Sequence, residues 1–472
     1  MICLLAWKRF QRRLPLHVGL PNHMITRIEI DGFKTFEDFA LDFKPFSAVV
    51  GPNASGKSNL FDALRFLSLL AQTDIRSAMQ ELRGEPEELF RQTAAGTASS
   101  LSFAVEVLLD EAGVDAFGTR YSVKARRLRY ELCLSIRIGT RGNPQGIFVT
   151  NEKCVSIQRK DDTATFITKE FLGSSGRKTP FISMVEEQGK RSAIEIRQDG
   201  PAESGTSKRG RPITLSAAEA SRTALSTIST AEFPHLYALR HLLSSMRFLE
   251  INPAAARRPS DKFEAKTLHP DASNLAAVLA YLRDGSGTEA RPEGVINDIS
   301  MHLASLIPSV RKVEVFDEAK DYSFGVRTSD GLKFSSRVIS DGTLRLLALL
   351  TILDDPDRVG ILCFEEPENG VHEGRIDALI GLLREASYLN ADQERPLFQV
   401  LVNTHSPAVL NALLDEEIIA ADMVTAVNPA SKSRHTKTRM RIDVQSGLEL
   451  DPARHLTRWE VDRILRRHSG EA

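Results

Sequence analysis

Residues 51–58 constrain the fold more than any other part of the chain, because they read GPNASGKS and match the G-x-x-x-x-G-K-[ST] pattern of a phosphate-binding loop. A β-prone apolar run at residues 46–50 precedes them, and residues 59–67 have the apolar spacing of a helix, so the order is strand, loop, helix. In that setting backbone N–H groups and a helix N-terminus face the phosphates, Lys57 reaches the β- and γ-phosphates, and Ser58 can ligate Mg²⁺. The chain is therefore predicted to bind a nucleoside triphosphate. The predicted contacts are Asn53, Ala54, Ser55, Gly56, Lys57, Ser58 and Asn59.

The composition excludes several other classes of protein. With 472 residues, 42% of them hydrophobic, the chain can form two or three globular units. The net charge of −1, from 61 basic and 62 acidic residues, gives no global sign of a nucleic-acid or membrane partner, so any such surface must be a local patch. The four cysteines lack paired metal spacing, and Cys363 lies in an apolar run, where it would act as a small core residue. We expect a reduced, cytoplasmic protein without membrane contact.

The chain divides into five predicted parts. Residues 1–23 are expected to be a disordered leader or the result of a mis-called start, because the short apolar run precedes its basic cluster and does not resemble a signal peptide. Globular patterning begins at Met24. The remaining parts are residues 24–110, the first part of the nucleotide-binding unit; 111–214, a β-rich lobe; 215–308, a helical lobe; and 309–472, the second part of the nucleotide-binding unit.

Local patterns predict the elements within these parts. Alternation at residues 101–107 and 130–138 predicts antiparallel strands, and residues 174–212, rich in Gly, Ser, Lys and Arg, predict a long exposed loop or a disordered insertion. Apolar spacing of three and four residues predicts helices, and short strands return after them. The predicted helices are residues 215–229, 236–246, 275–282 and 295–306, and the predicted strands are 310–316, 322–327 and 332–338.

Two later apolar strands end in side chains that can take part in nucleoside triphosphate hydrolysis, namely two carboxylates and a histidine. Residues 359–369 deliver Glu365 and Glu366 at the C-terminal end of a buried-type strand, where α/β sheets place ligands. One carboxylate can hold Mg²⁺ directly or through its water, and the other can deprotonate the water that attacks the γ-phosphate. Residues 397–407 similarly form an apolar strand with a polar end that contains His405, which suits a hydrogen bond to the γ-phosphate or the lytic water. The alternative interpretation of the carboxylate pair is an exposed acidic turn, and that of His405 is a structural histidine.

A Ser/Gly turn at residues 339–343 opens an apolar helix and predicts a second anion site in the same chain. The alternative is a simple N-cap, in which Ser340 or Asp341 accepts hydrogen bonds from the first N–H groups of the helix.

The order of these motifs resembles the ATP-binding-cassette heads of the SMC, RecF and OLD families, and most of all the prokaryotic predicted ATPases of the RecF/OLD-like group. Their characteristic stretches recur as residues 28–36, 274–279, 340–348 and 365–370. The implied fold is α/β, a P-loop NTPase of the ABC-ATPase head type with an antiparallel β lobe and a helical lobe. The implied cofactors are ATP and Mg²⁺, and the implied assembly is a homodimer or a higher oligomer.

The resemblance also implies roles for individual residues. ATP on Lys57 and Ser58 of one protomer would be closed over by Ser340 and Gly342 of the other. Glu365 would support Mg²⁺, Glu366 would be the catalytic base, His405 the switch histidine, and residues 369–372 the loop that crosses the dimer interface. The position of Glu365 is usually Asp, which water-mediated coordination tolerates, and the nearest candidate for the glutamine that links Mg²⁺ to the β lobe is Gln92.

Two functions remain open at this point. The chain shows neither the acidic cluster of the Toprim nuclease that OLD proteins carry nor the long coiled coil of SMC proteins. As an ATP-gated sensor or scaffold it would serve a separately encoded effector, such as a nuclease in phage defence; as a RecF-like ATPase it would clamp or repair DNA. A transporter ATPase is disfavoured by the signature sequence. DNA is a candidate partner also because residues 207–212, SKRGRP, resemble an AT-hook, although a solvated basic loop is the favoured interpretation.

Overall fold

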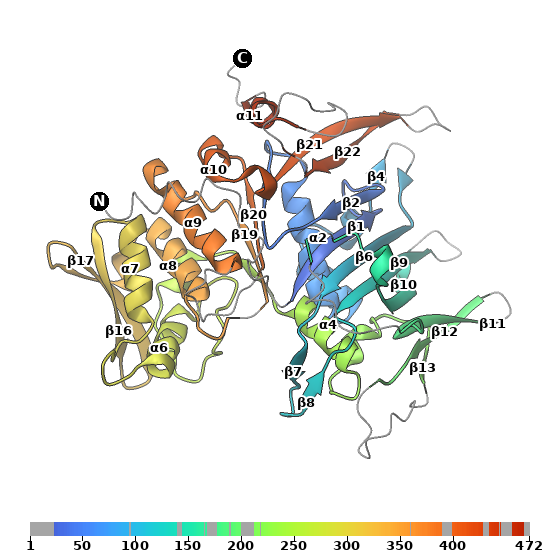
Figure 1. The fold of residues 1–472 in the computed structure, drawn as a ribbon, viewed down its shortest axis with the longest axis horizontal. Helices are drawn as coiled ribbons and strands as arrows, with labels where there is room; N and C mark the ends of the chain where they lie inside the picture. Colours follow the sequence, from blue (N-terminus) through green and yellow to red (C-terminus); the bar gives the residue numbers. More distant parts are fainter. Residues whose placement is uncertain are drawn as a thin grey trace.

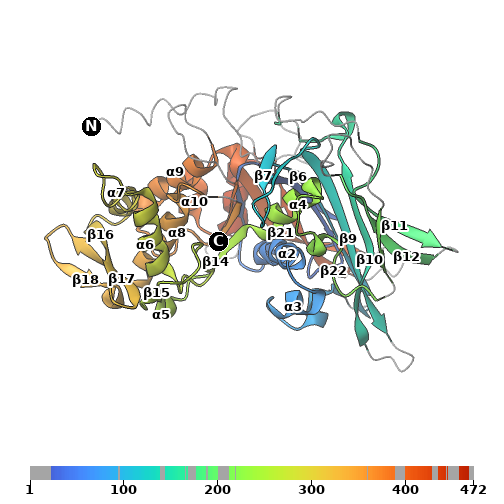
Figure 2. The same cartoon turned by 90° about the horizontal axis from the view of Figure 1, so that it is seen from below.

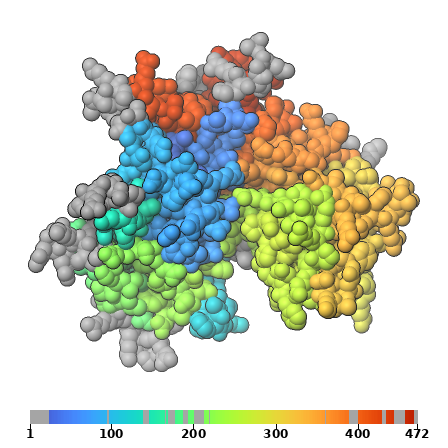
Figure 3. All heavy atoms as spheres, turned by 180° about the vertical axis from the view of Figure 1, so that it is seen from behind, coloured from blue at the N-terminus to red at the C-terminus, as the bar shows by residue number. Residues whose placement is uncertain are grey.

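The computed structural model describes residues 23–93, 96–138, 144–164, 166–167, 177–187, 190–199, 212–217, 219–358, 360–388, 399–427, 434–442, 444 and 456–466. A mainly parallel sheet lies at the centre, an antiparallel sheet lies on one side of it and a helical lobe lies on the other (Figure 1). The space-filling view from behind shows the same division, with the residues of the helical lobe gathered on one side (Figure 3).

The central sheet has six strands in the order β14-β19-β20-β3-β21-β22, and only the edge strand β22 runs antiparallel to its neighbour. Both faces of this sheet are covered, so β3, β19 and β20 are buried along almost their whole length. The phosphate loop follows β3, and the two predicted carboxylates are the last residue of β19, Glu365, and the residue after it, Glu366. The strands are β3 Phe46–Val50, β14 Met246–Leu249, β19 Ile361–Glu365, β20 Gln399–Thr404, β21 Ile418–Val427 and β22 Arg434–Arg441.

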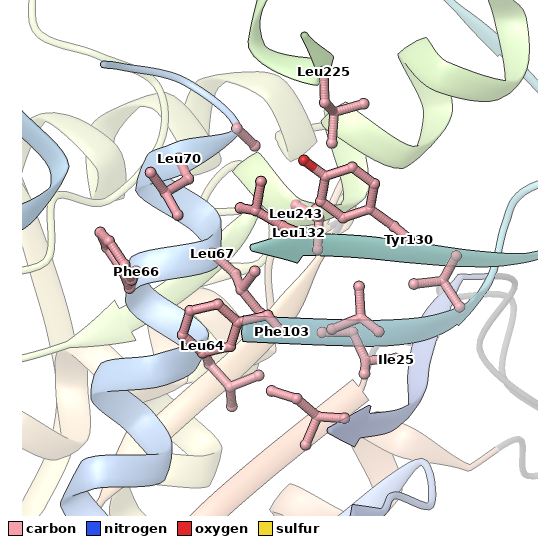
Figure 4. Close-up of a cluster of buried hydrophobic side chains, with 14 of the residues drawn as sticks. Ile25, Leu64, Phe66, Leu67, Leu70, Phe103, Tyr130, Leu132, Leu225 and Leu243 are labelled. Carbon is pink, nitrogen blue, oxygen red and sulfur yellow. The ribbon is translucent and has the colours of Figure 1, made fainter. Parts of the chain in front are cut away.

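Helix α2, Lys57–Leu70, fills the space between the central sheet and the antiparallel sheet (Figure 1). Its Leu64 and Leu67 belong to the same buried cluster as Phe103 and Leu132 from the antiparallel strands (Figure 4). The antiparallel sheet has eight strands in the order β13-β12-β11-β10-β9-β6-β1-β2. They are β1 Met24–Asp31, β2 Phe39–Asp42, β6 Ser100–Leu108, β9 Arg127–Ile138, β10 Pro144–Ser156, β11 Ile182–Glu187, β12 Lys190–Ile196 and β13 Ile213–Ser216.

The helical lobe packs on the opposite face of the central sheet and forms a second core (Figure 2). Alternate residues of β19 divide between the two cores, with Ile361 and Cys363 facing α2 and Leu362 and Phe364 facing the lobe. The lobe consists of α6 Leu275–Ser286, α7 Ile296–Leu306, α8 Asp341–Leu353 and α9 Ile376–Ser387, with a small sheet of β15 Ser260–Asp261, β16 Val310–Asp317, β17 Asp321–Thr328 and β18 Lys333–Ser335.

Most of the remaining elements are short. They are α3 Ile75–Gln80, η1 Pro86–Leu89, β4 Gln92–Thr93, β5 Gly96–Thr97, β7 Ala112–Val114, β8 Arg120–Ser122, η2 Arg159–Asp161, η4 Leu225–Thr227, α4 Pro234–Ser244, α5 Pro253–Ala256, η5 Ser336–Val338, η6 Glu373–Arg375, α10 Pro407–Ala412, η7 Asp415–Glu417 and α11 Arg458–Arg466. Among the described residues, no helix has the length and apolar run needed to cross a bilayer.

The expected helix over residues 215–229 is wrong. Leu215 pairs with Ile194 in the antiparallel sheet, and only the short turn η4 follows within the described part of this range. The amides of Ala224 and Leu225 donate to the buried carboxylate of Glu152 on β10, at 2.7 and 2.9 Å. Hydrogen bonds to a strand distant in sequence therefore replace the helical ones that the local spacing suggested.

Two further expectations need correction. The predicted loop over residues 174–212 contains the strands β11 and β12, whose Ile182, Ile194 and Ile196 are buried. The alternation of apolar and polar residues in these strands is short and lies among charged residues, so the composition of the segment obscured it. Residues 200–211, which hold most of the AT-hook-like segment, lie outside the described residues. The strand expected over residues 332–338 ends at Ser335 and is followed by the turn η5.

Candidate active site

The phosphate loop connects β3 to α2 in the predicted order. Its backbone adopts left-handed conformations at Ala54, φ 61°, and at Gly56, φ 89°, directly before the helix begins. A Cβ atom on Gly56 would overlap the Thr438 side chain, coming within 2.9 Å of its Cβ, so both backbone conformation and space require glycine here. The hairpin β21–β22 thus contacts the loop through Thr438.

Lys57 is buried inside this loop. Its Nζ donates to the carbonyl oxygens of Gly51 at 2.6 Å and Pro52 at 2.7 Å. Burial lowers the pKa of Lys57 to about 8, and the nearby carboxylates of Glu366, Glu368 and Glu365 act against that decrease. The ammonium group is therefore held at the loop by neutral acceptors, close to a cluster of carboxylates.

Ser58 and Glu365 meet at the start of α2. The Ser58 hydroxyl donates to Glu365 Oε2 at 3.2 Å, and the exposed Arg83 lies 3.5 Å from Glu365 Oε1. A hydroxyl and a carboxylate are hard oxygen ligands that fit Mg²⁺, which takes its remaining ligands from water and substrate phosphates. Within the described ranges, no group of three or more His, Cys, Asp or Glu side chains is arranged to hold a metal ion.

Glu366 and His405 come together from two neighbouring strands. Glu366 follows β19 with a left-handed backbone, φ 48°, and its N–H donates to the carbonyl oxygen of Asn403 on β20 at 2.9 Å. Asn369 donates to Glu366 Oε2 at 2.7 Å, and His405 Nδ1 lies 3.2 Å from Glu366 Oε1. One carboxylate oxygen is thus held by an amide, while the other faces the imidazole.

Several buried polar atoms around this point have no hydrogen-bond partner among the described residues. They are Ser55 Oγ, Arg345 Nε, Glu368 Oε2 and Asn403 Nδ2. Ser55 and Asn403 are each only 1% exposed. Unsatisfied buried polar groups are rare in folded proteins, and a bound water or ion is one explanation for them. Their position beside Lys57 and Glu366 fits a phosphate group and its lytic water.

The second predicted anion site lies at the start of α8. Ser340 is its N-cap, as the alternative interpretation expected, because its Oγ accepts from the Thr343 N–H at 3.2 Å. The Ser340 side chain is nevertheless exposed, and in the described structure its side-chain hydrogen bonds go to Thr343 and not to the phosphate loop of its own chain. Gly342 packs directly against Gly370, since a Cβ on Gly342 would lie 2.7 Å from Gly370 Cα.

Sequence patterns did not reveal several residues of the site. Arg345 reaches the main chain beside the carboxylate pair, and Asn403 supports it from β20. Thr35 joins the loop to the hairpin through hydrogen bonds with Asn59, at 2.9 Å, and Thr438, at 2.7 Å. These contacts link positions far apart in the chain, so no local spacing could indicate them. Gln92, the candidate glutamine, lies exposed on the hairpin β4–β5.

Two family models match separate parts of the chain. The RecF/RecN/SMC N terminal domain matches residues 24–131, and a family described as "AAA domain, putative AbiEii toxin, Type IV TA system" matches residues 197–411.

Curated relatives match over short stretches. Structural maintenance of chromosomes protein 1 of Arabidopsis thaliana is 45% identical over 49 residues, which is 10% of this chain and 4% of that protein. The chromosome partition protein Smc of Methanocaldococcus jannaschii is 50% identical over 44 residues, 9% of this chain and 4% of that protein. The chain therefore spans only about 4% of the length of the curated relatives it matches.

Solved SMC heads are similar over most of the chain at low identity. An SmcHead bound to the C-winged helix domain of ScpA has a TM-score of 0.46 at 12% identity, over 88% of this chain and 97% of that one. The SMC head domain from Thermotoga maritima has a TM-score of 0.35 at 12% identity, over 90% of this chain and 99% of that one. The family matches and the site together identify the chain as an ABC-type ATPase of the SMC- and RecF-related group.

Proposed function

We propose that the chain hydrolyses ATP as a homodimer closed around the nucleotide and that this cycle gates or scaffolds a separately encoded effector in phage defence, in the cytoplasm. The observation that carries the proposal is the convergence of Lys57, the pair Ser58 and Glu365, and the pair Glu366 and His405 at one edge of the central sheet. These groups supply phosphate binding, metal binding and a base, which are the parts that phosphoryl transfer to water requires.

Different residues of the chain would bind the phosphates, hold Mg²⁺ and accept the proton. Lys57 and the N–H groups of residues 53–59 would bind the β- and γ-phosphates, and Ser58 with Glu365 would hold Mg²⁺, whose charge neutralises the phosphate oxygens. Glu366 would accept a proton from the attacking water, because Asn369 fixes one of its oxygens and leaves the other toward His405. His405, whose side chain is exposed, would donate a hydrogen bond to the γ-phosphate.

The dimer is proposed because one chain carries two predicted anion sites, and no hydrogen bond joins them among the described residues. Ser340 and Gly342 lie at the start of α8, exposed or half-buried, and Ser340 makes its hydrogen bonds within α8. Two copies arranged head to head would place each Ser340 over the phosphate loop of the other copy. The helix N-terminus there favours a negatively charged ligand.

The defence role is proposed from the family description that covers residues 197–411, because it names a putative toxin of a toxin–antitoxin system. A RecF-like role in DNA clamping or repair is the second candidate, since the RecF/RecN/SMC N terminal domain matches residues 24–131. ATPase activity that duplex DNA stimulates in the purified protein would favour the DNA role. A requirement for the product of a neighbouring gene would favour the effector role.

Two variants test the chemistry. Lys57→Ala should abolish ATP binding, whereas Glu366→Gln should retain binding and reduce hydrolysis on the order of 10² to 10⁴-fold, as expected for loss of a general base. Phosphate release and equilibrium ATP binding measure the two effects separately. The matched control is Glu289→Gln, an exposed carboxylate of the helical lobe that should behave as wild type. Wild-type hydrolysis by Glu366→Gln would show that Glu366 is not the base.

A further inference from the structure

Helix α8 is tied at two points to the segment that carries the proposed base. Arg345 Nη2 donates to the carbonyl oxygen of Glu365 and lies 3.4 Å from that of Glu366, while its guanidinium covers the Phe364 ring with its carbon 4.9 Å from the ring centroid. One turn earlier, Gly342 is in backbone contact with Gly370. The first turns of α8 and residues 364–370 therefore cannot move independently.

The geometry of Arg345 is that of a clamp on the main chain. The half-buried guanidinium donates to two consecutive carbonyl oxygens and not to a carboxylate, and its buried Nε has no partner within the described part of the chain. Burial lowers the pKa of Arg345, against the attraction of Glu366, Glu368 and Glu365. The charge thus stays close to the carboxylates while its hydrogen bonds fix the backbone that presents them.

That backbone needs support. Glu366 has φ 48°, a left-handed conformation that is unfavourable for a non-glycine residue and persists only when its surroundings enforce it. Its N–H donates to Asn403 on one side, and its carbonyl oxygen faces Arg345 on the other. The direction of the Glu366 carboxylate therefore depends on contacts from both β20 and α8.

We propose that Arg345 is a positioning residue, which sets the direction of the Glu366 carboxylate through the carbonyl groups of residues 365 and 366 and couples it to closure of the dimer. Ser340 and Gly342 at the start of α8 face the partner's nucleotide in the proposed dimer, so closure over that nucleotide would fix the base in the same protomer. The inference rests on the proposed function, and it explains how one filled site can act on the other.

The first test is a double-mutant cycle on hydrolysis. Arg345→Met should lower kcat roughly 10- to 100-fold with KM changed less than about threefold, and it should cause no further loss when added to Glu366→Gln, because it acts through Glu366. Arg337→Met, at an exposed arginine of η5, is the matched control. Equal losses in both backgrounds, or an effect on KM alone, would overturn the positioning role.

The second test does not depend on activity. Hydrogen exchange of the peptide spanning residues 365–371 should be faster in Arg345→Met, while exchange in β3 stays unchanged and shows that the fold is intact. ATP should slow exchange of this peptide in the wild-type protein but not in Ser340→Arg. If the wild type fails to hydrolyse ATP, the proposed function is wrong. The comparison of wild type and Arg345→Met without nucleotide still tests whether Arg345 holds the main chain of residues 365 and 366. Unchanged exchange in Arg345→Met would overturn it.

Discussion

The pH dependence of ATP binding gives a quantitative test of the buried lysine. Burial lowers the pKa of Lys57 to about 8 in the nucleotide-free protein, and phosphate oxygens around the ammonium would raise that pKa in the complex. Binding then takes up a proton above pH 8, so affinity must fall as the pH rises. With a free-protein pKa near 8, Kd increases roughly tenfold between pH 7 and pH 9, whereas an ordinary lysine would change it by only about 3%.

The assay is equilibrium binding of a non-hydrolysable ATP analogue at saturating Mg²⁺, from pH 7 to pH 9. Lys57→Arg is the control, because a guanidinium stays charged over this range and should give a flat profile at weaker affinity. Subtracting its profile removes the titration of all other groups. A wild-type profile that is equally flat would refute the burial of Lys57 and its position beside neutral carbonyl acceptors.

Two further predictions concern the packing around the site and the core. Gly56→Ala should abolish nucleotide binding, because position 56 has a positive φ and the added Cβ would overlap Thr438. Adding Thr438→Ala should restore binding only in part, since the contact at 2.9 Å involves the Cβ that alanine keeps. Full binding by Gly56→Ala in a titration would contradict this prediction. Burial raises the pKa of Glu152 to about 7, so the native state binds more protons than the unfolded state between about pH 4.5 and pH 7, and stability should fall there as pH rises. The change is on the order of 3 kcal/mol, and Glu152→Gln should remove it; parallel unfolding profiles of the two proteins against pH would contradict the assignment.

Much of the site could be predicted from the sequence, because each motif is local. The phosphate loop, the carboxylates after β19 and the histidine after β20 all follow buried strands, and neighbouring parallel strands bring their C-terminal ends to one edge. Pattern alone therefore placed Lys57, Glu365, Glu366 and His405 together. The ABC-type fold that the motifs implied is confirmed, whereas the predicted domain boundaries and the individual catalytic roles stay predictions.

The rest depends on contacts between distant segments. Residues 215–229 have helical spacing, but pairing of Leu215 with Ile194 and capture of two amides by Glu152 determine their structure. The left-handed backbone at Glu366 is likewise set by Asn403 on another strand. Tertiary packing determines these conformations and overrides local propensity, whereas a single sequence shows only the local propensity.

The measurement that tests the central claim most directly is complementation between two inactive variants. Ser340→Arg keeps its own phosphate loop but should not close over a partner's nucleotide, and Lys57→Ala has an intact Ser340 but should not bind ATP. Each alone should neither dimerise with ATP nor hydrolyse it. Mixed in equal amounts, they should form an ATP-dependent heterodimer with one composite site and recover part of the hydrolysis. Failure of the mixture to recover activity, together with loss of ATP binding by the isolated Ser340→Arg protomer, would contradict the composite site and leave Ser340 as a helix cap.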